Sequence, residues 1–154
     1  MAAKNSDEQA LGHLRVVELG DIPASYATRW LADLRADVIK VEPPGGDPNR
    51  SLPPFAGNIE HPERSLTFIH ANTNKRSAVL DLERETDCET FAKLLASANL
   101  FVEATPLGHL EKFGFDDQRF HDGFPSLVVV SLTPFGRTGP YRYYKGSDAI
   151  ANAT

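Results

Sequence analysis

Five cationic side chains stand beside the segments that the sequence predicts as strands, and they are the residues here that could bind an anionic ligand. They are Lys75, Arg76, Lys112, Arg142 and Lys145. The chain of 154 residues has a net charge of −5, which disfavours bulk attraction to nucleic acid or to an anionic lipid surface. We therefore expect a phosphate-bearing ligand to bind at a local cluster of these cations.

The loop after the first predicted strand does not carry a dinucleotide fingerprint. It reads GDIPAS over residues 20–25, where G-x-G-x-x-G would be needed for a pyrophosphate to approach a helix amino terminus. Glu42 ends the second predicted strand, the place of a ribose-binding acid, but it stands without the glycines. Nicotinamide or flavin binding is therefore disfavoured.

Other common catalytic patterns are also missing from the sequence. The five histidines have no paired spacing of the kind that binds zinc, and neither a G-x-S-x-G elbow nor a GK[ST] phosphate loop occurs. The single cysteine, Cys88, excludes an internal disulfide and sits in a helical pattern, where we expect it to pack. We assign no metal ligand.

The start of the chain is polar, and we interpret residues 1–13 as an amino-terminal tail. It has no apolar region of a secretory signal peptide, and no apolar run approaches the roughly 20 residues of a membrane span. We expect a cytoplasmic location and neither a membrane nor a nucleic-acid partner.

Apolar runs and helical stripes alternate along the rest of the chain. Helices are predicted over residues 24–36 and after a capping box formed by Thr86 and Glu89, with a short helical or loop region over 108–121. The predicted strands are residues 14–19, 37–42, 77–82, 100–104 and 127–132. This alternation predicts an α/β fold with a mainly parallel sheet and helices on both faces.

Two helical stripes define the expected buried faces. The first is Ala27, Trp30, Leu31 and Leu34, and the second is Phe91, Leu94, Leu95 and Ala98. Residues 43–73 are rich in proline and glycine, so we expect a long loop with one short helix near residues 66–71. Ligands of open parallel sheets bind beyond the carboxyl ends of the strands, which nominates residues 20–25, 43–47, 81–83, 104–112 and 133–147.

Two stretches, ADVIKVEPPGGDPNR and NKRSAVLDL, occur in an order and spacing that resembles the class III coenzyme A transferases, the family of formyl-CoA transferase, carnitine CoA-transferase and acyl-CoA racemase. The likeness runs over residues 14–154 and covers the amino-terminal part of that family. It implies a Rossmann-like domain that binds coenzyme A. It also implies that the family's nucleophilic aspartate, its second domain and its dimer-forming segment lie further on.

The resemblance places contacts with coenzyme A at a set of positions in this chain. They are Ile22, Pro23, Ala24, Pro43, Leu80, Asp81, Leu82, Thr105, Lys112, Lys145, Gly146 and Ser147. Pro43 stands where the family often has an arginine, and the run 104–108 reads ATPLG in place of asparagine–phenylalanine–arginine–proline–glycine. Both departures remove potential ligand contacts.

The segment FGRTGPY, followed by Lys145-Gly146-Ser147-Asp148, resembles the family signature that closes over the pantetheine arm. Ser147 replaces the catalytic histidine of racemase members, so racemization is disfavoured. Ser147 and Asp148 are typical of the cap of a new helix. We do not assign Asp148 as the nucleophile, and we assign no catalytic residue.

Three functions are consistent with these observations. The first is the coenzyme A-binding portion of a transferase that moves CoA between an acyl-CoA donor and a carboxylic acid acceptor, with a homodimer expected at full length. The second is a non-catalytic half or subunit of a fused or heteromeric CoA-transferase-like protein. The third, an unrelated oxidoreductase domain, is disfavoured by the missing glycines.

Overall fold

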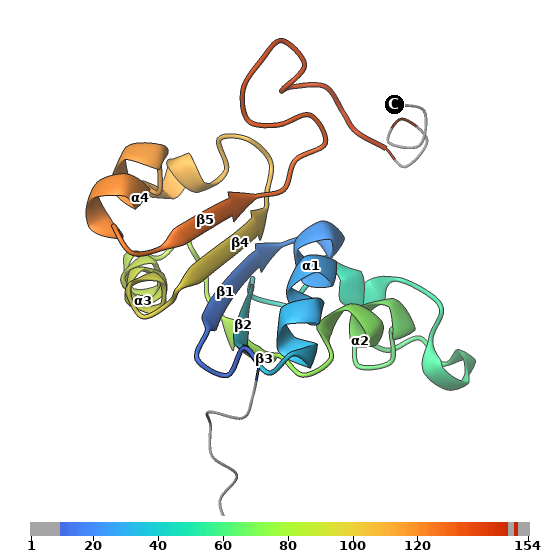
Figure 1. The fold of residues 1–154 in the computed structure, drawn as a ribbon. Coiled ribbons are helices and arrows are strands. Elements are labelled where there is room, and N and C mark those ends of the chain that lie inside the picture. Colours follow the sequence, from blue (N-terminus) through green and yellow to red (C-terminus); the bar gives the residue numbers. More distant parts are fainter. Residues whose placement is uncertain (1–9, 148–149, 151–154) are drawn as a thin grey trace, which may run out of the picture.

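Five parallel strands form one sheet in the order β3-β2-β1-β4-β5 (Figure 1). The computed structural model describes residues 10–147 and residue 150. The strands are β1 (Arg15–Gly20), β2 (Asp37–Glu42), β3 (Arg76–Val79), β4 (Leu100–Ala104) and β5 (Val128–Ser131). The predicted parallel α/β fold is confirmed, and the bounds predicted for the second and fourth strands match the structure.

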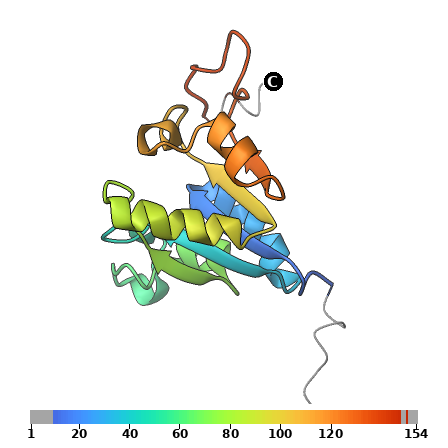
Figure 2. The ribbon, with the colours of Figure 1, turned by 90° about the vertical axis from the view of Figure 1, so that its left-hand side faces the viewer.

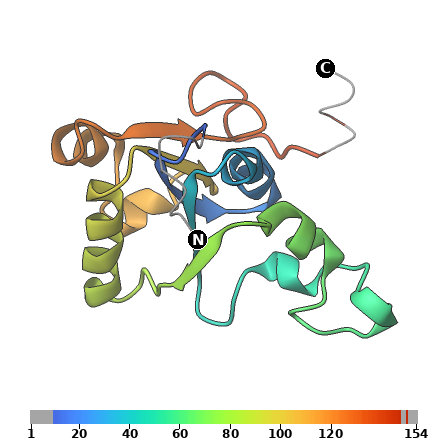
Figure 3. The same cartoon turned by 60° about the horizontal axis from the view of Figure 1, so that its bottom comes forward.

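Helices cover both faces of the sheet. Figures 2 and 3 show α3 on one side and α1 with α2 on the other. The helices are α1 (Ile22–Asp33), α2 (Leu66–Asn72), α3 (Glu85–Ala96) and α4 (Asp117–Gly123), with short 3-10 turns at η2 (Pro48–Ser51), η3 (Ala56–Asn58) and η4 (Leu110–Phe113). Phe91, Leu95 and Ala98 are buried in the core beneath α3, so the second predicted stripe is confirmed. In the described part of the chain, no helix is long and apolar enough to span a membrane.

The first predicted stripe is wrong for most of its residues. Ala27, Trp30 and Leu34 are exposed, Trp30 by 57% and Leu34 by 50%, and only Leu31 is partly buried against the core. Tyr26, which is not in the predicted stripe, is 47% exposed on the same helix. The buried residues of α1 are small or carry a hydroxyl group: Ala24, Ser25, Thr28 and Ala32. The helix therefore presents its small and hydroxyl-bearing residues to the sheet and its large aromatic residues to solvent.

A buried carboxylate on the sheet explains this inversion. Glu18 of β1 points at α1, and its oxygens accept hydrogen bonds from the hydroxyl groups of Ser25 and Thr28, each at 2.6 Å. A buried charge must be hydrogen-bonded or paired, because desolvation costs several kcal/mol. The hydroxyl residues of α1 meet this requirement, so they occupy the positions where large apolar residues would otherwise pack.

The long segment 43–73 is mostly irregular, as expected, and α2 is the short helix within it. The capping box predicted for α3 is wrong, because Thr86 and Glu89 both lie inside the helix and Arg84 is the N-cap without a side-chain hydrogen bond. The first turn instead carries Glu85 and Asp87, whose charges suit the positive end of the helix dipole. The third strand spans Arg76–Val79 and so ends earlier than the predicted residue 82, although the Leu80 N–H still donates to the Glu42 carbonyl of β2 at 3.0 Å.

Candidate functional site: the cleft at the carboxyl ends of the strands

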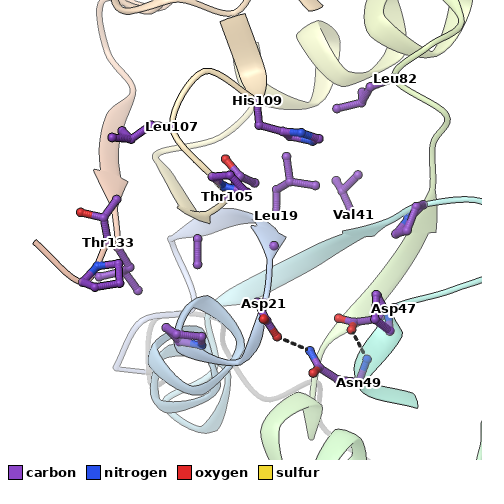
Figure 4. A pocket seen from close by; sticks show the side chains of 18 of the residues that line it. Leu19, Asp21, Val41, Asp47, Asn49, Leu82, Thr105, Leu107, His109 and Thr133 are labelled. Atoms are coloured by element: carbon purple, nitrogen blue, oxygen red, sulfur yellow. Dashed lines mark hydrogen bonds between the residues drawn. The ribbon is translucent and has the colours of Figure 1, made fainter. Parts of the chain in front are cut away.

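The segments that follow all five strands line one cleft of about 1110 Å³ (Figure 4). Its floor includes Leu19 at the end of β1, Val41 near the end of β2 and Leu82 beyond β3. Because carboxyl ends of parallel strands lie along one edge of a sheet, segments distant in sequence meet here. The cleft is where the sequence placed a ligand site.

A chain of hydrogen bonds joins two loops at one rim of the cleft. The Asn49 backbone N–H donates to Asp47 Oδ1 at 2.7 Å, and the Asn49 side-chain amide donates to Asp21 Oδ1 at 2.9 Å (Figure 4). Asp21 is also the N-cap of α1 and accepts the Ile22 N–H at 2.7 Å. The loop after β2 is thus fixed to the loop after β1.

Buried charges beneath this rim hold it to the sheet. Lys40 Nζ lies 2.7 Å from Asp47 Oδ2 and 2.8 Å from Glu18 Oε1, and it also donates to the Gly20 carbonyl at 3.3 Å. Lys75 Nζ lies 2.7 Å from Glu18 Oε2. Two ammonium groups therefore face two carboxylates in a nearly inaccessible cluster, and each charge has a partner of opposite sign.

These pairs control the protonation states inside the cluster. Burial by itself raises the pKa of Glu18, but the neighbouring ammonium groups of Lys40 and Lys75 outweigh it and bring the pKa below its ordinary value. For Lys40 burial lowers the pKa, yet the Glu18 and Asp47 carboxylates produce a net rise. Both groups are therefore ionised near pH 7.

Glu42, at the end of β2, is a second buried carboxylate below the rim. Arg50 binds it with two donors at 2.7 and 2.9 Å, Ser77 Oγ donates at 2.6 Å, and the Asp47 N–H donates at 2.9 Å. Burial raises the pKa of this carboxyl, but these hydrogen bonds dominate and lower it to about 2. Glu42 is therefore fully used in holding the loop, and its side chain has no capacity left for a ribose.

The cleft brings together most of the residues that the resemblance assigned to coenzyme A. Those that line it are Pro23, Pro43, Leu80, Asp81, Leu82, Thr105, Lys145 and Gly146. Ala24 is fully buried under the cleft, and Ile22 is about one-third exposed beside it. Lys112 and Ser147 are exposed and do not line the cleft in this structure.

The expected cluster of cations is smaller than the sequence indicated. Lys75 is buried against Glu18, and Arg76 pairs with Asp37 at the amino-terminal end of the strands, so neither lines the cleft. Their position before β3 explains this, since only residues after a strand reach the carboxyl end. The cations that line the described cleft are Arg142 and Lys145, and the imidazole of His109 also lines it.

His109 is a cleft residue that no motif in the sequence singles out. It lines the cleft above Leu19 and Val41 (Figure 4) and meets the Phe113 ring edge to face at 5.3 Å. Its ring nitrogens make no hydrogen bond with any described residue of the chain. The feature of the sequence that could have identified His109 is its position in residues 104–112, one of the segments expected beyond the carboxyl ends of the strands. Other cleft residues outside the predicted set include Asp21, Asn49, Tyr143 and Tyr144.

Comparison with known proteins identifies the family to which this fold belongs. The profile of CoA-transferase family III matches residues 11–154. The chain belongs to this family. Among curated relatives, the succinyl-CoA:(R)-benzylsuccinate CoA-transferase subunit BbsE of Thauera aromatica is 38% identical over 94% of this chain. The succinyl-CoA:mesaconate CoA-transferase of Haloarcula hispanica is 42% identical over 84% of it.

Solved structures agree with this membership. A CAIB/BAIF family protein from Brucella suis superposes with a TM-score of 0.79 at 40% identity, covering 89% of this chain and 36% of that one. Rv3272 from Mycobacterium tuberculosis gives a TM-score of 0.82 at 29% identity, covering 94% of this chain and 39% of that one. The chain spans only 35% of the Thauera relative and 34% of the Haloarcula relative, about a third of their length.

Proposed function

We propose that the cleft binds the coenzyme A moiety of an acyl-CoA, and that this chain is the coenzyme A-binding portion of a class III CoA-transferase. Such an enzyme would move CoA between an acyl-CoA donor and a carboxylic acid acceptor, as the names of the relatives describe for those proteins. The observation that carries the proposal is one large cleft beyond all five strands with two cations in its wall.

The chemistry of the lining suits the parts of this ligand. Leu19, Val41 and Leu82 offer apolar contact to a pantetheine chain or to a base. Arg142 and Lys145 offer positive charge to phosphates on an otherwise acidic chain. When bound, the coenzyme supplies the thiol that carries the acyl group, and the described residues serve to bind and orient it.

The chain's own residues do not provide a nucleophile in this proposal. Asp148 lies outside the described residues, and the resemblance places the family's nucleophilic aspartate further on. A homodimer and a cytoplasmic location remain part of the proposal for the full-length protein.

The second candidate is a non-catalytic half or subunit of a heteromeric transferase. Its support is the departure at Pro43 and at residues 104–108, where the cleft wall carries Thr105, Pro106 and Leu107 and lacks an arginine. Two relatives are themselves named as subunits, the Thauera protein and an alpha subunit from Chloroflexus aurantiacus. A cleft that does not bind coenzyme A would favour this candidate.

Titration calorimetry with coenzyme A and with pantetheine tests the proposal. Coenzyme A should bind more tightly, because it alone carries phosphates. Lys145→Ala should weaken coenzyme A binding about two- to fivefold, more at low salt, since an exposed ion pair contributes only about 0–1 kcal/mol. Lys93→Ala, an exposed lysine of α3, is the matched control and should change nothing.

Lys112→Ala tests whether Lys112 contacts a phosphate, as the resemblance implies, although it does not line the cleft in this structure. A loss equal to that of Lys145→Ala would place Lys112 at a phosphate. Equal binding of coenzyme A and pantetheine, with no response to Lys145→Ala, would rule out the phosphate site.

A further inference from the structure

The loop over residues 133–147, which follows β5, supplies one wall of the cleft but is held mainly to itself. The Tyr144 N–H donates to the Tyr141 carbonyl at 2.8 Å, and the Arg142 guanidinium donates to the Gly139 carbonyl at 3.2 Å. The Phe135 ring meets Tyr144 at 6.2 Å, still within the loop. Figure 1 shows this loop standing beyond the carboxyl ends of β4 and β5.

Arg137 is the exception. Its Nη1 lies 3.3 Å from Glu103 Oε1 and 3.3 Å from Ser131 Oγ, and its Nη2 lies 3.1 Å from Glu111 Oε1 and 3.0 Å from Asp117 Oδ1. No other residue of the segment 133–147 makes a hydrogen bond or an ion pair with residues 10–132, the described part of the chain before this loop. One guanidinium therefore joins the loop to β4, to the end of β5, to η4 and to α4.

Glu103 is the partner that gives this contact its strength. Its side chain is 1% exposed at the end of β4, and its Oε2 is already occupied by the N–H and the hydroxyl group of Thr105 at 2.7 and 2.6 Å. Removing Arg137 would leave Oε1 buried without a cation, which is costly. Asp117 is 85% exposed, so its ion pair with Arg137 contributes little.

The geometry of the contact requires an arginine. A planar guanidinium can reach several acceptors in different directions at once, whereas a lysine ammonium acts as a single point charge. Arg137 reaches four acceptors on four elements, and it lies only five positions before Arg142 in the same loop. The contacts that fix Arg137 therefore restrict the positions that Arg142 and Lys145 can take in the cleft.

We propose that Arg137 is a positioning residue that anchors the loop 133–147 to the end of β4 and so places Arg142 and Lys145 in the cleft. Arg137 does not itself line the cleft in the described structure. The effect on ligand binding rests on the proposed function, whereas the anchoring of the loop does not.

Limited trypsin digestion tests the anchoring without a ligand. Arg137→Gln should raise the rate of cleavage after Arg142 and Lys145, read by mass spectrometry, roughly tenfold, because a released loop opens locally more often. Arg137→Lys should give an intermediate rate. Asp117→Asn, which removes only the exposed partner, is the control and should match the wild type, and thermal unfolding verifies that every variant is folded.

A double-mutant cycle in coenzyme A affinity tests the positioning. Arg137→Gln should weaken binding several-fold, and Lys145→Ala should then add little further loss, because Lys145 is already displaced. Additive losses, or unchanged tryptic cleavage in folded Arg137→Gln, would overturn the proposal. Wild-type chain that fails to bind coenzyme A would count against the proposed function alone, since the digestion still decides the anchoring.

Discussion

Glu18 and Lys40 face each other as register partners on the parallel strands β1 and β2, and their side chains meet at 2.8 Å with 0% and 2% of their surfaces exposed. The pair does more than neutralise charge. Lys40 continues to Asp47 in the loop after β2 and to the Gly20 carbonyl in the loop after β1. A buried ion pair in the sheet thus supports two loops that line the cleft.

Removing one partner of this pair should destabilise the fold. Glu18→Leu leaves Lys40 and Lys75 buried with too few anions, and we expect a loss of about 3–5 kcal/mol in the free energy of unfolding, measured by urea titration with circular dichroism. Arg84→Gln breaks an exposed pair with Asp81 and should cost about 1 kcal/mol or less. Equal stabilities of the two variants would contradict the structural role of the cluster.

Acid should weaken the domain through Glu42. Its folded pKa of about 2 lies below the ordinary 4.5, so its contribution is present above pH 4.5 and is lost as the pH falls from 4.5 to 2. The contribution at pH 7 should be roughly 3 kcal/mol. Urea titrations at several pH values should show that the free energy of unfolding of Glu42→Gln changes less between pH 4.5 and pH 2 than that of the wild type. Glu89 is exposed, so Glu89→Gln is the control and should keep the wild-type dependence of the free energy of unfolding on pH.

Gly20 sits where β1 enters the cleft, and alanine should not be tolerated there. Its φ is +108°, and an added Cβ would lie 2.7 Å from the Ala104 carbonyl oxygen of β4. Gly45 has a comparable φ of +91° but open space around it. Gly20→Ala should therefore lower the free energy of unfolding, measured by urea titration, by roughly 1–3 kcal/mol more than Gly45→Ala, because of the clash. Equal losses would show that backbone strain alone sets the cost.

His109 should contribute to ligand affinity. Its ring nitrogens are free of partners among the described residues, and the ring faces the centre of the cleft, so His109→Leu removes a hydrogen-bonding group while keeping an apolar side chain. A hydrogen bond contributes about 0.5–1.5 kcal/mol, which predicts a loss of about two- to tenfold in calorimetric affinity for coenzyme A. His121→Leu, at an exposed position on α4, should not change the affinity.

The strands could be predicted from the sequence because apolar β-branched runs end at glycine, proline or a charge. The buried face of α1 could not be predicted, because apolar periodicity assumes an apolar sheet beneath the helix. Here Glu18 and Lys40 lie under α1. The helix provides Ser25 and Thr28, whose hydroxyl groups hydrogen-bond to Glu18, and Ser25 also accepts a hydrogen bond from Lys40. Trp30 then remains on the outer face.

The position of the candidate cleft was predictable from the sequence, whereas the residues that line it were only partly predictable. The rule for parallel sheets and the family resemblance both led to the strand ends, and Lys145 and Thr105 do line the cleft. Nothing in the sequence distinguishes Lys75, whose side chain is buried against Glu18, from Arg142 and Lys145, which line the cleft. Nor could the sequence show that Arg137 reaches Glu103 across 34 positions of the chain.

The strand order also constrains the time course of folding. β1 pairs on one edge with β2, which is near in sequence. The other edge of β1 can pair only after β4 has been synthesised, because Gly20 of β1 aligns with Ala104 of β4. At about 5–20 residues per second, a ribosome needs roughly 4–17 s to synthesise the chain between them. During that interval this edge of β1 has no partner strand, and the cleft lacks the segments after β4 and β5 that line it in the folded protein. Nascent chains are therefore most prone to pairing with one another before Ala104 emerges.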